Sequence, residues 1–139
     1  MAKSKERLRQ KDAGDRIEEL TAEDYADAFD HLLESKQLPE SYLKMLVGHA
    51  NAENHTASMR TIASFAGWKK HNTANLHYGR LAGLVAEHFG ITAEDMKDAG
   101  YDKTYAIAWV AKDMDDAGEC QWTLREKVVE ALRSVGMLD

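Results

Sequence analysis

The apolar residues of this chain follow helical spacing along most of its length, but one segment near the C-terminus alternates them instead. Between residues 104 and 125 the alternating positions are Tyr105, Ile107, Trp109 and Ala111, and later Cys120, Trp122 and Leu124. Alternation with aromatic and β-branched residues is typical of half-buried strands. The intervening residues 113–119 contain Asp115-Asp116-Ala-Gly118, which favours a turn. We therefore predict one β-hairpin, over residues 104–125, in an otherwise helical chain.

Start and stop residues divide the remainder into short amphipathic helices. A helix start needs a side chain that accepts a hydrogen bond from the first turn, and a stop favours glycine. The predicted N-caps are Thr21, Thr56 or Ser58, Asn72 and Thr92, with Pro39 beginning a further helix. The predicted stops are Gly67, Gly90, Gly100 and Gly136. The pattern predicts a helix from Asn72 to about Phe89, and a last helix whose apolar face includes Val128 and Leu132.

The length of 139 residues fits one domain. Residues 1–20 are charged and poor in large apolar side chains, so we expect a flexible lead before a helical domain over residues 21–139. The alternative is a basic arm that contacts a partner through Lys3, Lys5, Arg7, Arg9 and Lys11. No apolar run suits a membrane span or a secretory signal, so we expect a cytoplasmic protein. The lone Cys120 allows no internal disulfide and is expected in the core.

Two helices joined by a short turn and followed by a hairpin occur in that order in a winged helix-turn-helix domain. In such a domain the second helix of the pair enters the major groove of DNA, and the hairpin lies over the backbone. The predicted fold is therefore mainly α with one β-hairpin (α+β), arranged as a single winged-helix-like domain.

The charge pattern favours the same interpretation, although the net charge is −6. Between Glu53 and Glu87 there is no Asp or Glu, so this stretch would give one surface a positive potential. Its candidate nucleic-acid-binding residues are Arg60, Lys69, Lys70, His71, Asn72, Thr73, Asn75, His77 and Arg80, with Lys112 on the hairpin. Lysines and Arg60 suit phosphates, whereas Asn75, His77 and Arg80 suit base edges or an ordering role.

The same residues also have a structural interpretation that involves no ligand. Asn72 and Thr73 would then be helix caps, Lys69 and Lys70 solvated turn residues, and Asn75 an internal hydrogen-bonding group. Trp68 lies beside the two lysines, where an exposed aromatic ring would stack on a base or anchor a partner.

Three runs of sequence form a recognisable pattern: Ala52-Glu-Asn-His-Thr-Ala-Ser-Met-Arg-Thr-Ile-Ala-Ser-Phe-Ala-Gly-Trp68, Thr73-Ala-Asn-Leu-His-Tyr-Gly-Arg-Leu81 and Trp122-Thr-Leu-Arg-Glu-Lys-Val-Val-Glu-Ala-Leu-Arg-Ser-Val-Gly136. Together they resemble a module found beside HNH endonuclease domains in bacterial restriction and defence proteins. The Asn75-Leu-His-Tyr78-Gly79 core is the most specific part. The resemblance implies a DNA-facing accessory domain of winged-helix type. The chain departs from it in lacking the family's proline near Glu53 and a nuclease domain.

We find no pattern that indicates an enzyme, a cofactor or a metal site. His49, Asn51 and His55 are spaced like an HNH motif, but they fall between helices and not on the ββα frame that such a site needs. Pairs of histidines six residues apart do not share a helix face. We therefore expect a non-enzymatic protein without cofactors.

Two functions remain open. The first is a double-stranded DNA-binding regulator or defence-associated accessory protein. The second is a phage-type inhibitor or adaptor, anti-CRISPR-like, that binds a basic nucleic-acid-handling complex through acidic residues 18–40 or 113–119. A homodimer through either terminal helix is compatible with both.

Overall fold

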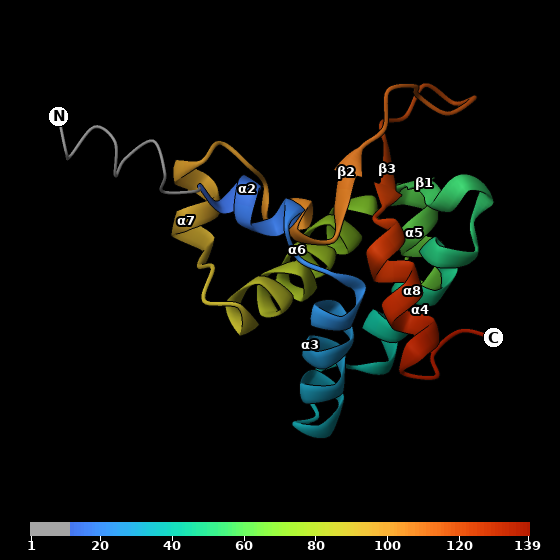
Figure 1. Ribbon diagram of the computed structural model, residues 1–139. Coiled ribbons are helices and arrows are strands. Elements are labelled where there is room, and N and C mark those ends of the chain that lie inside the picture. The colour runs from blue at the N-terminus through green and yellow to red at the C-terminus, as the bar shows by residue number, and fades with distance from the viewer. Residues whose placement is uncertain (1–11) are drawn as a thin grey trace, which may run out of the picture.

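The computed structural model describes residues 12–139 (Figure 1). The predicted basic residues Lys3 to Lys11 lie outside the described residues. Within them the protein is mostly helical, as predicted. Its α-helices are α2 (Ala13–Glu18), α3 (Ala22–Glu34), α4 (Glu40–Asn51), α5 (Met59–Phe65), α6 (His71–His88), α7 (Ala93–Asp98) and α8 (Glu126–Ser134). Two 3₁₀ turns are η1 (Glu53–His55) and η2 (Lys103–Ala106).

A small antiparallel sheet of three strands completes the fold. Its strands are β1 (Thr56–Ser58), β2 (Ala108–Val110) and β3 (Gln121–Leu124), in the order β1-β3-β2. The register places Trp122 of β3 between Ala57 of β1 and Val110 of β2. The predicted hairpin between β2 and β3 is confirmed. Strand β1 was not predicted, because its residues Thr56 and Ser58 were interpreted as candidate helix caps.

The hairpin is shorter than the predicted range of residues 104–125. Lys103–Ala106 forms η2 instead of a strand, because the Asp102 carboxylate accepts a hydrogen bond from the Thr104 amide at 2.9 Å and starts a turn. Cys120 is exposed, so its predicted place in the core is wrong. It lies at the end of the β2–β3 loop, outside the strands of the sheet.

The prediction of a flexible lead over residues 1–20 is wrong for residues 13–18, which form helix α2. Ile17 is buried in the core. Arg16 donates to the carbonyl of Phe89 at 2.9 Å, and Glu18 forms an ion pair with Arg125 at 2.9 Å. These contacts attach α2 to the rest of the domain.

Most of the predicted helix starts are confirmed. Thr21 and Thr92 each form a capping box, and Ser58 accepts from the Thr61 amide to begin α5. Asn72 is not an N-cap, because α6 begins one residue earlier, at His71. Lys70 occupies the N-cap position and supplies no side-chain hydrogen bond, which leaves the first-turn amides of α6 without a side-chain cap.

The core lies between the helices and one face of the sheet, and α6 passes through its centre (Figure 1). Helix α3 packs on α8, while α6 packs on α5 and on η2. The Tyr25 hydroxyl of α3 donates to the carbonyl of Ala106 at 2.6 Å, which fixes η2 against the helices. The largest fully buried side chains include Tyr25, Phe29, Met45, Ile62, Tyr78, Leu81 and Leu124.

A buried histidine joins α4 to both α6 and the sheet. His49 is fully buried, with Nδ1 2.7 Å from the Tyr78 hydroxyl and Nε2 2.8 Å from the Trp122 carbonyl oxygen. A carbonyl can only accept, so Nε2 carries the proton and Nδ1 accepts from Tyr78. Burial in the core lowers the pKa of His49 to about 4, partly offset by the Trp122 carbonyl. The ring is therefore neutral at pH 7.

This histidine makes folding sensitive to acid. Its pKa is 6.5 in an ordinary setting and about 4 in the fold, so the unfolded chain binds the proton first and stability falls as pH decreases from about 6.5 to 4. The shift corresponds to about 3 kcal/mol of unfolding free energy. Urea unfolding at a series of pH values measures this slope. We expect His49→Gln to be less stable at pH 7 and to lose most of the slope, whereas His88→Gln, at an exposed histidine, retains it. Equal wild-type stability at pH 7 and pH 4.5 would contradict the assignment.

Two glycines within helices have opposite surroundings. A β-carbon at Gly48 of α4 would lie 2.3 Å from Cγ of Phe65, whereas one at Gly83 of α6 would lie 3.5 Å from Cδ of Lys103. The first is a clash with the base of a ring, which tilting the ring cannot relieve. The second is an ordinary contact.

We therefore expect Gly48→Ala to destabilise the protein by about 1–3 kcal/mol and Gly83→Ala to stabilise it by up to about 1 kcal/mol through helix propensity. Urea unfolding of the two variants measures both changes. If both substitutions changed the free energy of unfolding in the same direction, local packing would not account for the difference between these positions.

Candidate nucleic-acid interface

The first half of α6 presents a polar and basic face to solvent. Together with the turn that precedes it, this face contains the exposed predicted residues Lys69, Lys70, His71, Asn72, Asn75 and Arg80. None of them forms an ion pair with an acid among residues 12–139. The structure thus brings together six of the ten predicted residues, on α6 and on the turn before it. Their polar groups are free to contact a ligand.

The opposite face of α6 explains why the polar face points outward. Tyr78, Leu81, Ala82 and Val85 are buried, and Ala74 continues this face toward the helix start. Gly67 has φ +80, a left-handed conformation that suits glycine and ends α5. The chain then reaches α6 after a short turn, as the sequence predicts for a helix-turn-helix.

Two predicted residues of α6 turn toward the protein. Thr73 is half-buried. The Nδ1 atom of His77 lies 2.9 Å from the Tyr42 hydroxyl, and its ring lies 5.0 Å from the half-buried Trp68 ring. His77 therefore has the ordering role, since it joins α4, the turn and α6, and Trp68 packs on it.

Arg60 and Lys112 lie beside acidic residues, away from the basic face. Arg60 of α5 forms an ion pair with Glu119 of the β2–β3 loop at 2.8 Å. Asp113, Asp115 and Asp116 belong to the same loop, which projects from the sheet in Figure 1. A phosphate approaching Arg60 would compete with Glu119, so this arginine is a weaker candidate than the α6 residues.

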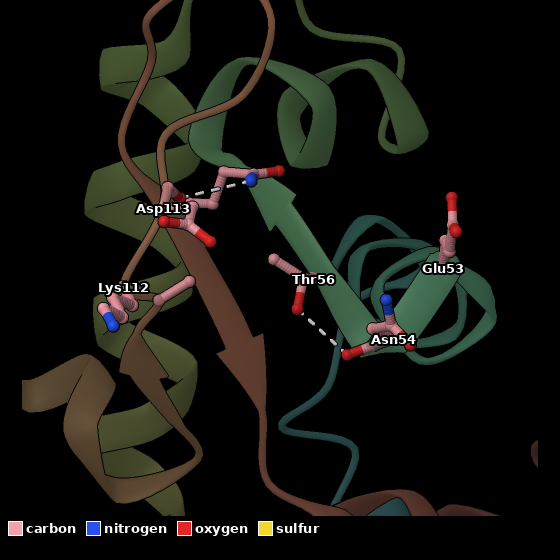
Figure 2. Close-up of a pocket in the computed structure, with 7 residues that line it drawn as sticks. Glu53, Asn54, Thr56, Lys112 and Asp113 are labelled. Atoms are coloured by element: carbon pink, nitrogen blue, oxygen red, sulfur yellow. Dashed lines mark hydrogen bonds between the residues drawn. The ribbon is translucent and has the colours of Figure 1, made fainter.

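Lys112 lines a polar cavity of about 420 Å³ between the η1–β1 segment and the ends of β2 and β3 nearest their loop. Figure 2 shows Lys112 and Asp113 on one side of it and Glu53 and Asn54 on the other. Asn54 has φ 56, and the next residue also has a positive φ. No predicted residue of α6 lines this cavity, and its two carboxylates outnumber its one ammonium group. Lys112 is thus separated from the α6 residues and lies in a locally acidic setting.

The structure adds two residues that the sequence interpretation did not include. Leu76 is 53% exposed on the polar face, one helical turn from both Asn72 and Arg80. An exposed leucine there suits an apolar contact, such as a thymine methyl group. Its position could have been found from helical spacing. The other residue is Lys103 of η2, whose side chain lies against α6 beside Gly83. Only the tertiary structure reveals that contact.

Helix α6 also favours anions at its N-terminus for electrostatic reasons. The amides of its first turn have no side-chain cap, and the helix dipole places partial positive charge at that end. From residue 54 to residue 86 the chain has four Lys or Arg residues and no acid. Lys69 and Lys70 add full charges beside the partial charge, so an anion would meet several donors at one place.

The HNH-like triplet does not form a common site. His49 is buried, Asn51 is exposed, and Nδ1 of His55 lies 2.6 Å from the Ala50 carbonyl oxygen. In residues 12–139 no three His, Cys, Asp or Glu side chains are grouped so that they could hold a metal ion. In the same range, no helix combines the length and apolar character needed to cross a membrane.

The most specific motif of the sequence has a structural role in part. Tyr78 is buried and bonded to His49, and Gly79 is buried beneath η2, with Thr104 and Lys103 the nearest side chains to a β-carbon at that position. Asn75 alone of the three is exposed. Comparison with protein-family models, with curated proteins and with solved structures finds no match to this chain.

Proposed function

We propose that this protein is a non-enzymatic recognition protein of winged-helix type that binds double-stranded DNA through the first half of α6. The order of its elements supports the proposal. A helix (α4), a strand (β1), two helices joined by a turn (α5 and α6) and a hairpin (β2–β3) occur in the order of a winged helix-turn-helix, with α7 and η2 inserted between α6 and the hairpin. The second helix of the pair is then the recognition helix. A cytoplasmic location and a regulatory or defence-associated role belong to the same proposal.

The observation that carries the proposal is the exposed face of the first half of α6, which has unpaired basic groups, amide groups and no acid. From His71 to Arg80 the helix is about 15 Å long, which spans a major groove about 12 Å wide. Lys69 and Lys70 precede it, where the phosphate backbone would lie. Asn72 and Asn75 carry amide groups that read the edge of adenine.

The acidic β2–β3 loop limits how such a complex forms. Asp113 and Asp116 are exposed, and a hairpin laid on the backbone would bring them close to phosphates. We therefore propose that the contacts come from α6 and the turn before it, with the loop held away from the DNA. Few phosphate contacts imply modest affinity and a shallow salt dependence.

Charge reversal of the turn tests this function. We expect Lys69→Glu with Lys70→Glu to lower affinity for a generic duplex at low salt by at least about tenfold, because two phosphate contacts become repulsive. Fluorescence anisotropy at several salt concentrations measures the affinity. A control with Lys36→Glu and Lys97→Glu applies the same charge change at exposed lysines elsewhere. Unchanged binding in the turn variant, or an equal loss in the control, would rule out a specific α6 interface.

A second candidate function has its own supporting observation. Beside the loop acids lie the exposed apolar residues Trp109, Val110 and Met114, of which Met114 is 68% exposed. The loop is ordered, because Oδ1 of Asp115 accepts from the amides of Ala117 and Glu119. An ordered acidic and apolar loop suits a basic protein surface, as the inhibitor or adaptor function requires.

Reversing the loop charges tests this alternative. Asp113→Lys with Asp116→Lys is expected to weaken salt-sensitive binding to a purified RNA-guided nuclease complex by about tenfold or more. The Lys69 and Lys70 reversal should leave that binding intact. Equal binding by wild type and the loop variant, or no binding by wild type, would remove support for this function.

A further inference from the structure

A groove beside α6 contains two positive side chains that approach from different elements. It has a volume of about 320 Å³ and is lined by Arg80 and Gly83 of α6, Lys103 of η2 and Tyr42 of α4, among others. Lys103 lies outside the helix-turn-helix, in the segment between α6 and the hairpin. The groove adjoins the exposed face of α6, because Arg80 belongs to both.

The path of the Lys103 side chain sets where its charge lies. A β-carbon at Gly83 would have Cδ of Lys103 3.5 Å away, and one at Gly79 would have Cε 4.0 Å away. The side chain therefore runs along α6 toward the helix N-terminus, since Gly79 is one turn earlier than Gly83. Arg80 is the residue after Gly79, and both Arg80 and Lys103 line the groove.

The acids near the groove compensate these two positive charges only in part. Glu87 also lines the groove, but it lies two helical turns beyond Arg80, about 10 Å along the axis. Asp102 caps η2 by accepting from the Thr104 amide. No ion pair joins Arg80 or Lys103 to an acid among residues 12–139. The lining has formal charges of +2 from these residues and −1 from Glu87.

We propose that Arg80 and Lys103 form a binding site for a phosphate group in this groove. The guanidinium offers several donors in one plane, and the ammonium of Lys103 supplies a point charge from a second element, η2. The ligand is a phosphate of the DNA backbone, in which case the inference rests on the proposed function, or a free polyphosphate. In a complex with DNA, Lys103 of η2 would contact a backbone phosphate that the α5–α6 turn does not reach. Lys103 is then a determinant of affinity that does not distinguish sequences.

The test removes the charge and keeps the shape. Lys103→Met retains a chain of similar length over Gly79 and Gly83, and Lys97→Met is the matched control at an exposed lysine of α7. Binding to a generic duplex is measured by anisotropy across salt concentrations. We expect Lys103→Met to lower affinity severalfold and to reduce the slope of log affinity against log salt by about 0.9, the value for one lost phosphate contact. Lys97→Met should change neither.

A second arm uses inorganic tripolyphosphate as the probe, followed by amide and side-chain NMR signals. Shifts at Arg80 and Lys103 that are lost in Lys103→Met support the phosphate site even if the duplex does not bind, in which case only the proposed function fails. If the Lys69 and Lys70 reversal weakens DNA binding while Lys103→Met behaves like Lys97→Met, and tripolyphosphate shifts neither residue, the proposed function stands and this site is overturned. No response in either arm overturns both. Unchanged thermal melting of the variants confirms that the fold is retained.

Discussion

The arrangement of α6 depends on the buried imidazole of His49. This ring contacts α6 through Tyr78 and the central strand through the Trp122 carbonyl, so one side chain of α4 fixes the helix pair against the sheet. Both of its nitrogens are satisfied only in the neutral form with the proton on Nε2. The contact between Tyr42 and His77 is a second polar contact between α4 and α6. It lies nearer the surface and supports the turn before α6. The outward face of α6 is therefore set by polar contacts on its inward face.

A second polar centre holds α2 and η2, which lie outside the α5–α6 pair. Arg125 is 5% exposed, and it donates to the Tyr105 carbonyl and pairs with Glu18. Its guanidinium also lies 4.4 Å from the centre of the Tyr105 ring. Because these partners come from α2 and η2, one side chain at the end of β3 fixes both segments. The position of Lys103 over α6 follows from this anchoring and from the Tyr25 hydrogen bond to Ala106.

The sequence was sufficient wherever a local pattern determines the structure. Capping boxes at Thr21 and Thr92 act within one turn, and the hairpin shows alternation on both sides of its loop. Prediction failed where a contact with a residue far away in the sequence determines the structure. Helix α2 has a charged sequence and folds because Arg16 and Glu18 find partners more than seventy residues away. The sequence did not show which of the ten site residues have partners inside the protein, because Arg60 contacts Glu119 and His77 contacts Tyr42 only in the folded chain.

The distribution of charge then accounts for a domain that is acidic overall and has one basic face. A net charge of −6 repels a polyanion at long range, so any contact with DNA relies on groups at short range. At 0.1 M salt the screening length is about 10 Å, so the local field at the first half of α6 depends mainly on the residues nearest to it. The β2–β3 loop presents the opposite sign together with apolar side chains. Under the two functions proposed above, a nucleic acid and a basic protein would bind at these separate places, and the sign of the local field would select between them.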